Sequence, residues 1–300
     1  MKQITYSFKP VLNCNMCNAP ASDFKILGRR MNTSQGKSPS KRIGISTTVV
    51  KCSNCHLIFS NPQPIPARIE DHYGVEPEEY WKGEHFIPNS FFIKSILEKA
   101  QFHAGKNGRL LDIGSGVGNT MKVLLDAGFD VFGFEPSGPF YKYSITNNGI
   151  PAERVQHKSL EEAEFPKNYF DYILFRVVLE HIYDPSEGLK KAMSWTKKGG
   201  KIEIEVPSSR WLINKLANLF YKLQNKDYVV NISPMHQPYH LFEFDIKSFQ
   251  LNGERFGYKV VDHHYFVAKT YMPKILDGLF TWVMSKTKTG MQLIVVLEKL

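Results

Sequence analysis

The stretch Leu110-Leu-Asp-Ile-Gly-Ser-Gly-Val-Gly118 decides the fold of this 300-residue chain. An apolar run reaches one acidic residue, Asp112, and then enters a turn with glycines at positions 114, 116 and 118. Glycine adopts positive φ angles and lets the backbone approach a ligand closely. Because residues 119–127 are rich in helix formers, the stretch predicts a strand, a ligand-binding turn and a helix.

A second carboxylate follows at the expected distance. The run Val131-Phe-Gly-Phe-Glu135 predicts the next strand, and Glu135 comes 17 residues after Gly118, where an acidic side chain can bind the hydroxyls of a ribose. A dinucleotide site is the nearest competitor, but it needs the spacing G-x-G-x-x-G so that a helix N-terminus faces a pyrophosphate. Here the spacing is G-x-G-x-G, and the negative charge of Asp112 suits a cationic ligand better than two phosphates.

Short apolar runs alternate with helical stretches from residue 105 to residue 300, which predicts an α/β domain with crossover helices. The expected strands cover residues 109–113, 130–135, 155–157, 172–175, 201–206, 258–267 and 292–298. Two insertions, 208–251 and 271–286, are expected to shape the substrate pocket. Residues 67–104 are expected to form a helical linker that covers the pocket with the aromatic cluster Tyr73, Tyr80, Trp81, Phe86, Phe91 and Phe92.

All four cysteines lie in the first 55 residues, as the C-x-x-C pairs Cys14/Cys17 and Cys52/Cys55. Two such pairs supply the four thiolates of one tetrahedral zinc site, and a redox role is the alternative. The 34 residues between the pairs exceed the usual spacing, so residues 34–41 are expected to form a loop. The zinc domain is expected to span residues 1–66 and to end in the proline-rich connector 61–66.

The formal net charge of +9 is concentrated near the N-terminus, because residues 1–66 contain nine Lys and Arg and one acid, Asp23. Such a segment attracts nucleic acid, a phosphorylated substrate or an anionic membrane, or it offsets the charge of four zinc-bound thiolates. No apolar run has the length of a membrane span, and a cytoplasmic protein is expected. Residues 211–223 and 272–284 combine apolar and basic side chains, which suits either a membrane surface or a lid.

The motif 112–118 and Glu135 resemble the first and second motifs of class I S-adenosylmethionine-dependent methyltransferases. Residues 170–185, with Leu-Glu-His at 179–181, are similar to the fourth-strand segment of the ubiquinone-biosynthesis-like branch. Residues 14–66 resemble the zinc ribbon that precedes this domain in some bacterial members. The resemblance implies a Rossmann-like, seven-stranded methyltransferase sheet after a small zinc-ribbon domain.

The same resemblance implies the residues that bind the cofactor, S-adenosylmethionine. Gly114 and Gly116 pack against its methionine part and Glu135 binds its ribose, and Asp112 and Gly118 complete the cofactor-binding set.

Three further positions follow from the resemblance alone. Ser159 and Leu160 would flank the adenine, and Arg176 would begin the loop beneath the sulfonium. Each has a structural alternative: Ser159 as a helix cap, Leu160 as a core residue and Arg176 as a partner in a surface ion pair.

Methyl transfer is an in-line displacement, so the protein mainly positions the acceptor and removes its proton. His181 follows the fourth expected strand closely and is the first candidate base, with an ordinary pKa near neutrality; the alternative is that it packs against the next helix. His240, and His236 beside it in the long insertion, rank second. Some related O-methyltransferases hold a divalent cation through an acid three residues before the Glu-His pair. That position is Val177 here, so metal-assisted catalysis is not expected.

The sequence therefore predicts a methyltransferase for a small or carrier-linked acceptor. The resemblance points to a sugar nucleotide or polysaccharide precursor, with transfer to oxygen favoured. An RNA methyltransferase that uses its zinc ribbon to bind RNA is the main alternative, and the sequence does not favour a nucleic-acid partner. A third reading is a non-catalytic zinc-ribbon adaptor. The chain has no Asn-Pro-Pro-Tyr-type segment for base-amine methylation and no cysteine beyond the two pairs to attack a pyrimidine.

Overall fold

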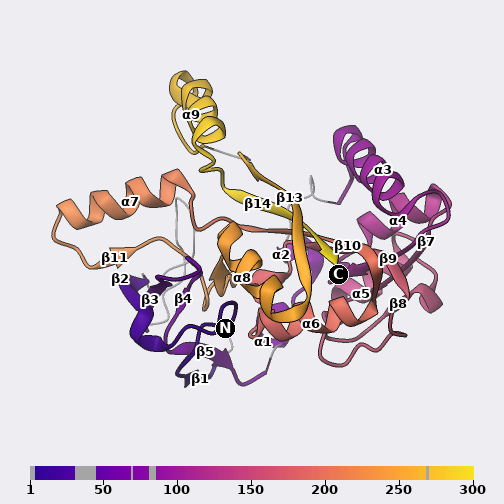
Figure 1. Cartoon of the computed structure of the whole chain (residues 1–300), viewed down its shortest axis with the longest axis horizontal. Helices are drawn as coiled ribbons and strands as arrows, with labels where there is room; N and C mark the ends of the chain where they lie inside the picture. The colour runs from indigo at the N-terminus through magenta and orange to yellow at the C-terminus, as the bar shows by residue number, and fades with distance from the viewer. Residues whose placement is uncertain (1–3, 31–44, 69, 81–85, 268–269) are drawn as a thin grey trace.

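The computed structural model describes residues 4–30, 45–68, 70–80, 86–267 and 270–300. A seven-stranded sheet lies at its centre, in the order β13-β14-β10-β9-β6-β7-β8 (Figure 1). Its strands are β6 (Arg109–Ile113), β7 (Asp130–Phe134), β8 (Val155–Gln156), β9 (Phe170–Arg176), β10 (Thr196–Pro207), β13 (Tyr258–Phe266) and β14 (Gln292–Lys299). Each overlaps a strand expected from the sequence. The sheet is mixed, because β14 runs antiparallel to both β10 and β13 while β6 to β10 pair in parallel.

Helices cover both faces of this sheet, and the strand residues alternate between two cores. Leu110, Tyr172 and Leu174 pack with α3 (Ser90–Ala104) and α4 (Asn119–Asp126), and α5 (Gly138–Thr146) lies beside them. Leu111 and Phe175 point to the other face, against α6 (Pro185–Trp195) and α8 (Ile246–Phe256). Strands buried on both faces need apolar residues at every position, which explains their continuous apolar runs.

The N-terminal residues form two further small sheets. β1 (Tyr6–Lys9) pairs with β5 (Gln63–Pro66). β2 (Phe24–Arg30), β3 (Thr47–Cys52) and β4 (Ile58–Ser60) are extended by β11 (Tyr228–Val229) and β12 (Phe242–Glu243), which come from the 208–251 insertion. The sequence assigned this insertion to the pocket, and Pro238 and His240 do line the cavity described below, but its two short strands also complete the N-terminal sheet. The structure thus joins segments that the sequence placed in different domains.

The cysteine-containing turns share one apolar core with the central sheet. Met16 and Cys52 belong to the same buried cluster as Leu111 and Trp195. Helix α8 holds these turns by their backbone: Asn252 Nδ2 donates to the Met16 carbonyl at 2.9 Å, and Ser248 Oγ donates to the Cys55 carbonyl at 3.0 Å. A buried carbonyl needs such a donor, so α8 is part of what positions the four cysteines.

The remaining helices lie at the periphery. α1 (Glu70–Tyr73) and α2 (Pro77–Tyr80) precede α3, and short 3-10 turns occur at Ala21–Asp23, Ala152–Arg154 and Leu179–His181. α7 (Leu212–Leu223) and α9 (Lys274–Thr287) project from the body (Figure 1). Among the described residues, no helix combines the length and apolar character needed to cross a membrane. The expected loop 34–41 and Trp81 lie outside the described residues.

Candidate functional site

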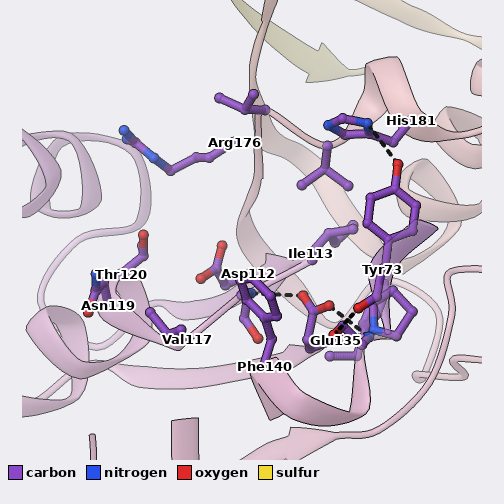
Figure 2. A pocket seen from close by; sticks show the side chains of 18 of the residues that line it. Tyr73, Asp112, Ile113, Val117, Asn119, Thr120, Glu135, Phe140, Arg176 and His181 are labelled. Atoms are coloured by element: carbon purple, nitrogen blue, oxygen red, sulfur yellow. Dashed lines mark hydrogen bonds between the residues drawn. The ribbon is translucent and has the colours of Figure 1, made fainter. Parts of the chain in front are cut away.

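A cavity of about 640 Å³ opens at the carboxyl ends of β6, β7 and β9 (Figure 2). This volume is within the range of ordinary small-molecule sites. Its lining includes nine of the residues predicted from the sequence: Asp112, Gly114, Gly116, Glu135, Ser159, Leu160, Arg176, His181 and His240. The structure therefore brings together side chains that lie up to 128 positions apart in the chain.

The glycines of the first turn have left-handed backbone angles, with φ of +64° at Gly114, +56° at Gly116 and +80° at Gly118. Gly118 is absent from the cavity lining, and its contact with the cofactor stays a prediction. It caps the N-terminus of α4, and a Cβ there would lie 2.9 Å from Ile150 on the side of α5. The third glycine is thus required by helix packing.

The carboxylate of Glu135 is fixed by two backbone amides of the surrounding loops. Gly116 N donates to Oε2 at 2.9 Å, and Ser137 N donates to Oε1 at 2.8 Å. Each oxygen keeps a lone pair for a further donor such as a ribose hydroxyl. The neighbouring hydroxyl of Ser115 is buried and has no hydrogen-bond partner among the described residues. Buried polar atoms normally have partners, so this orphan hydroxyl fits a cavity that receives a polar ligand.

Asp112 and Glu135 are both buried in the cavity wall, and burial raises the pKa of each to about 7. For Asp112, the positive charge of Arg176 opposes this shift and the charge of Glu135 adds to it. A cationic ligand that neutralises these carboxylates would relieve the cost of their burial. The pair therefore provides a site for a ligand that carries positive charge and hydroxyl groups.

The three positions taken from the resemblance alone all line the cavity, and Leu160 and Arg176 also have their structural roles. Ser159 N donates to Glu162 Oε2 at 3.0 Å within a turn, and no helix follows it in this described part of the chain. Leu160 is buried in the core cluster. Arg176 forms an ion pair with Glu205 at 3.3 Å and lies over the ring of Phe92. Lining a cavity does not exclude these roles, so the cofactor contacts of the three remain predictions.

His181 lies just after β9, on the turn Leu179–His181, and lines the cavity. Val177 begins this loop with φ of +57°, an unfavourable angle for a β-branched residue. The Nδ1 atom of His181 lies 3.0 Å from the Tyr73 hydroxyl and 3.3 Å from the Tyr239 carbonyl (Figure 2 shows the first contact). A carbonyl only accepts, so it favours the tautomer with the proton on Nδ1, which leaves Nε2 unprotonated and able to accept one.

Burial lowers the pKa of His181 to about 4, and only the contact with the Tyr239 carbonyl opposes this shift. The expectation of an ordinary pKa near neutrality is therefore wrong, because the sequence does not reveal the burial of the ring. At neutral pH the imidazole is uncharged. It has the protonation state that a base requires, although its proton affinity is lower than that of an exposed histidine.

His240 joins the site from the insertion, with its ring centroid 5.1 Å from that of His181. Its Nε2 lies 3.8 Å from Oε1 of Glu180, a fully buried carboxyl group whose oxygens have no hydrogen-bond partner among the described residues. Burial raises the pKa of Glu180 well above its usual value and lowers that of His240. Glu180, His181 and His240 each place one ligand atom within 4.8 Å of the others. The absence of a catalytic metal stays a prediction. His236 does not line the cavity.

Sequence reasoning missed the role of Tyr73 in the short helix α1. Its hydroxyl contacts His181, and its carbonyl accepts a 2.7 Å hydrogen bond from Ser137 Oγ, so it connects the Glu135 loop to the His181 loop. Tyr239 has a similar role: its ring stacks on His72 at 3.9 Å and its carbonyl faces His181. The aromatic cluster of residues 67–104 was the available signal, but it did not indicate the partner of Tyr73.

The four cysteines form a second candidate site, remote in sequence from the cavity residues. Their sulfurs lie within 4.8 Å of one another, with Cys14 to Cys55 at 3.5 Å and Cys17 to Cys52 at 3.6 Å. Tetrahedral zinc with Zn–S bonds of about 2.3 Å needs sulfurs roughly 3.8 Å apart, so the set fits a zinc ion.

The two C-x-x-C turns also match each other in the backbone. Asn18 and His56, which follow the second cysteine of each pair, have φ of +62° and +66°. Asn18 N donates to the Cys14 carbonyl at 2.8 Å, and His56 N donates to the Cys52 carbonyl at 3.0 Å. Paired turns of one geometry that direct four thiols to one point are typical of a structural metal site.

A family profile described as a methyltransferase domain matches residues 85–263, more than half of the chain. The chain belongs to this family. Membership supports an enzyme that uses S-adenosylmethionine, and the glycine turn and Glu135 lie within the matched residues.

Similar proteins differ in the activity that their names state. An uncharacterized methyltransferase from Anoxybacillus flavithermus is 31% identical over 105 residues, which cover 32% of this chain and 46% of the relative. A tRNA U34 carboxymethyltransferase from Syntrophotalea carbinolica is 32% identical over 101 residues, which cover 32% of this chain and 31% of the relative. The chain thus spans less than half the length of these two relatives. A ubiquinone biosynthesis O-methyltransferase from Bordetella avium is 24% identical over 179 residues, which cover 59% of this chain and 70% of the relative.

Solved structures include an S-adenosylmethionine-dependent methyltransferase from Archaeoglobus fulgidus, with a TM-score of 0.45 and 19% identity over 72% of this chain and 97% of that one. Another, from Mesorhizobium loti, has a TM-score of 0.49 and 11% identity over 69% of this chain and 98% of that one.

Proposed function

We propose that this chain transfers a methyl group from S-adenosylmethionine to an acceptor bound in the same cavity, beside His181. One observation carries the proposal: Glu135 is buried in the cavity wall and is held by the amides of Gly116 and Ser137. Two amides aimed at one carboxylate fix it for a ligand rather than for an internal ion pair.

The cofactor would lie between the first two strands of the sheet. S-adenosylmethionine, when bound, supplies an electrophilic methyl carbon. Asp112 and the backbone of Gly114 and Gly116 would hold its methionine part, and Glu135 would accept from its ribose hydroxyls. Ser159 and Leu160 would contact the adenine, and Arg176 would form part of the wall near the sulfonium.

His181 would remove the proton of the acceptor, with Tyr73 and the Tyr239 carbonyl fixing its ring. His240, which lines the same cavity, is the second candidate for this role. We propose a small or carrier-linked acceptor, of the class of a sugar nucleotide or polysaccharide precursor, with transfer to oxygen. The volume of the cavity supports a small acceptor group, and the Bordetella avium relative is named as an O-methyltransferase.

We further propose that Cys14, Cys17, Cys52 and Cys55 bind one structural zinc ion. The sulfur separations and the paired turns support it. The site shares the apolar core of the catalytic sheet, so its role would be to stabilise the fold.

RNA methylation is the second candidate function. The basic N-terminal segment favours it, and one relative is named as a tRNA-modifying enzyme. A non-catalytic adaptor is disfavoured because the glycine turn and both cavity carboxylates are intact.

Replacing Glu135 with Gln tests the cofactor site. The variant should bind S-adenosylmethionine more weakly by roughly 1.5–3 kcal/mol, the value of a hydrogen bond to a charged group. Isothermal titration calorimetry measures the difference, and Glu153→Gln, on the 3-10 turn Ala152–Arg154 outside the cavity lining, is the matched control. Unchanged affinity in a folded Glu135→Gln variant would show that the ribose site lies elsewhere.

A further inference from the structure

Helix α7 presents its apolar side to solvent and its polar side to the protein. Leu216, Leu219, Phe220 and Leu223 follow the spacing i, i+3, i+4, i+7 of a single helix face, and all four are exposed, Phe220 by 56% and Leu223 by 76%. A surface helix ordinarily turns this face toward the core. The inverted orientation therefore calls for a partner outside the described chain.

Polar contacts hold α7 in this orientation. Asn214 is buried and donates to Glu243 Oε1 at 3.1 Å, and Asn218 donates to Asn231 Oδ1 at 2.7 Å. Asn218 Oδ1 also accepts from the Val230 amide at 2.9 Å. Two asparagines one helical turn apart thus anchor the inner face, so the exposure of the leucines is built into the fold.

Helix α9 has the same character. Ile275, Leu279 and Trp282 share one face and are exposed, Ile275 by 90% and Trp282 by 61%. Figure 1 shows α9 standing away from the body of the molecule. An exposed tryptophan among aliphatic residues on a helix is typical of the interface between water and a bilayer.

The start of α7 lies beside the residues that flank α9, at the edge of the sheet at which the cavity opens. Leu212 N donates to the Thr289 carbonyl at 3.2 Å, and the rings of Trp211 and Tyr271 lie 5.8 Å apart. Helix α7 follows the end of β10 and α9 precedes the start of β14, where Pro207 pairs with Gln292. Arg176, in the cavity wall, pairs with Glu205 at the same end of β10.

The charge around these faces favours an anionic partner. Residues 212–226 contain three lysines and no acid, and residues 274–288 contain three lysines and one acid, Asp277. In the described part of the chain, none of the six lysines forms an ion pair with another residue. A twofold contact between two copies would bring these lysines together, whereas an anionic bilayer would attract them. Neither helix has the length to span a bilayer, so each would lie along its surface.

We propose that the exposed faces of α7 and α9 form a docking surface for a bilayer that contains anionic phospholipid. The surface consists of Leu216, Leu219, Phe220 and Leu223 on α7 and Ile275, Leu279 and Trp282 on α9. Docking brings the cavity-bearing edge of the sheet toward the bilayer, and a carrier-linked acceptor anchored there would reach His181. This last step rests on the proposed function, whereas the docking does not.

Vesicle flotation of the full chain tests the docking without measuring methyl transfer. Vesicles of phosphatidylcholine with phosphatidylglycerol, in a ratio of about three to one, should carry the protein, and phosphatidylcholine alone should carry much less. The double variants Leu219→Glu/Phe220→Glu and Leu279→Glu/Trp282→Glu should each lower the partition coefficient at least about tenfold. Replacing Lys222 and Lys286 with Gln should remove most of the preference for anionic vesicles.

The matched control is Ile26→Glu/Phe102→Glu, which adds the same charge at exposed apolar residues on β2 and α3. It should float like the unmodified protein. All variants change exposed side chains, and far-UV circular dichroism with a melting curve reports whether the fold is kept. The proposal is overturned if the unmodified chain does not float with anionic vesicles, or if the helix variants float as well as the control. It is also overturned if sedimentation velocity shows that these faces hold two copies together and vesicles do not compete.

Discussion

The ring of His181 is held between Tyr73, from a short helix near the N-terminus, and the Tyr239 carbonyl, from the long insertion. Both partners lie far from His181 in the sequence, and both reach a loop that starts at the strained residue Val177. Strained backbone near a cavity is maintained only where surrounding contacts impose it. The two contacts together keep one histidine nitrogen occupied and leave the other available.

His181→Gln should lower turnover by about 10²–10⁴, the usual loss when a general base is removed. S-adenosylmethionine affinity should stay nearly unchanged, because the residues proposed to hold the cofactor belong mainly to the first two strands. Since burial lowers the pKa of His181 to about 4, the acidic limb of the pH profile should lie well below neutrality and disappear in the variant. The exposed His264 supplies the control, as His264→Gln. Turnover equal to that of the unmodified enzyme would direct attention to His240, and lost cofactor binding would indicate a structural role.

At the scale of elements, the N-terminal turns, the insertion and α8 are held together by polar contacts in the interior. Asn252 is fully buried and contacts the Met16 carbonyl, Ser186 Oγ and the Tyr258 hydroxyl. Such a residue connects the cysteine turns to both α6 and β13. A metal bound at the cysteines would therefore stabilise more than the N-terminal sheet.

The paired replacement Cys52→Ser/Cys55→Ser should abolish binding of one zinc ion per chain, because each C-x-x-C pair supplies only half of a tetrahedral site. It should also lower the thermal midpoint, since metal-binding free energy contributes to folding. Elemental analysis and a melting curve measure the two effects, with Ser53→Ala in the same turn as the control. A metal-free chain with an unchanged melting curve, or zinc retained in the variant, would contradict the assignment.

At the scale of the whole molecule, the net charge of +9 leaves RNA as a partner to be tested. An RNA methyltransferase would bind one structured RNA tightly and keep its preference as salt rises. A small-molecule enzyme should show weak retention without preference, which falls steeply with salt as counterions compete. Filter binding of a structured tRNA and an unrelated RNA at several salt concentrations separates the cases. Salt-resistant discrimination between them would favour the RNA function over the one proposed.

The sequence predicted the strands of the central sheet well, because continuous apolar runs separated by helices follow directly from burial on both faces. It also predicted that Asp112, near the end of β6, and Glu135, directly after β7, lie at one cavity, while their cofactor contacts stay predictions. It missed Tyr73 and Tyr239, the lowered pKa of His181 and the pairing of β11 and β12 with the N-terminal sheet. These depend on contacts between distant segments, which no local pattern records.

Gly118 shows a related limit of prediction from a local sequence pattern. A motif indicated ligand contact, and the structure shows a further reason for a glycine here, its backbone angle and its close packing against Ile150. The spacing of glycines in the sequence does not show whether a glycine leaves room for a ligand or for a neighbouring helix.

Calorimetric titration of the chain with S-adenosylmethionine at pH 8 and pH 6 tests the central claim most directly. Asp112 and Glu135 have pKa values of about 7, so both lose negative charge as the pH falls through neutrality. Binding of a cationic cofactor should be strong and one to one at pH 8. It should weaken toward pH 6, by up to about tenfold per pH unit for each carboxylate that must be ionised. In Asp112→Asn the dependence should be shallower. No binding at pH 8, or an affinity that rises toward pH 6, would contradict the account.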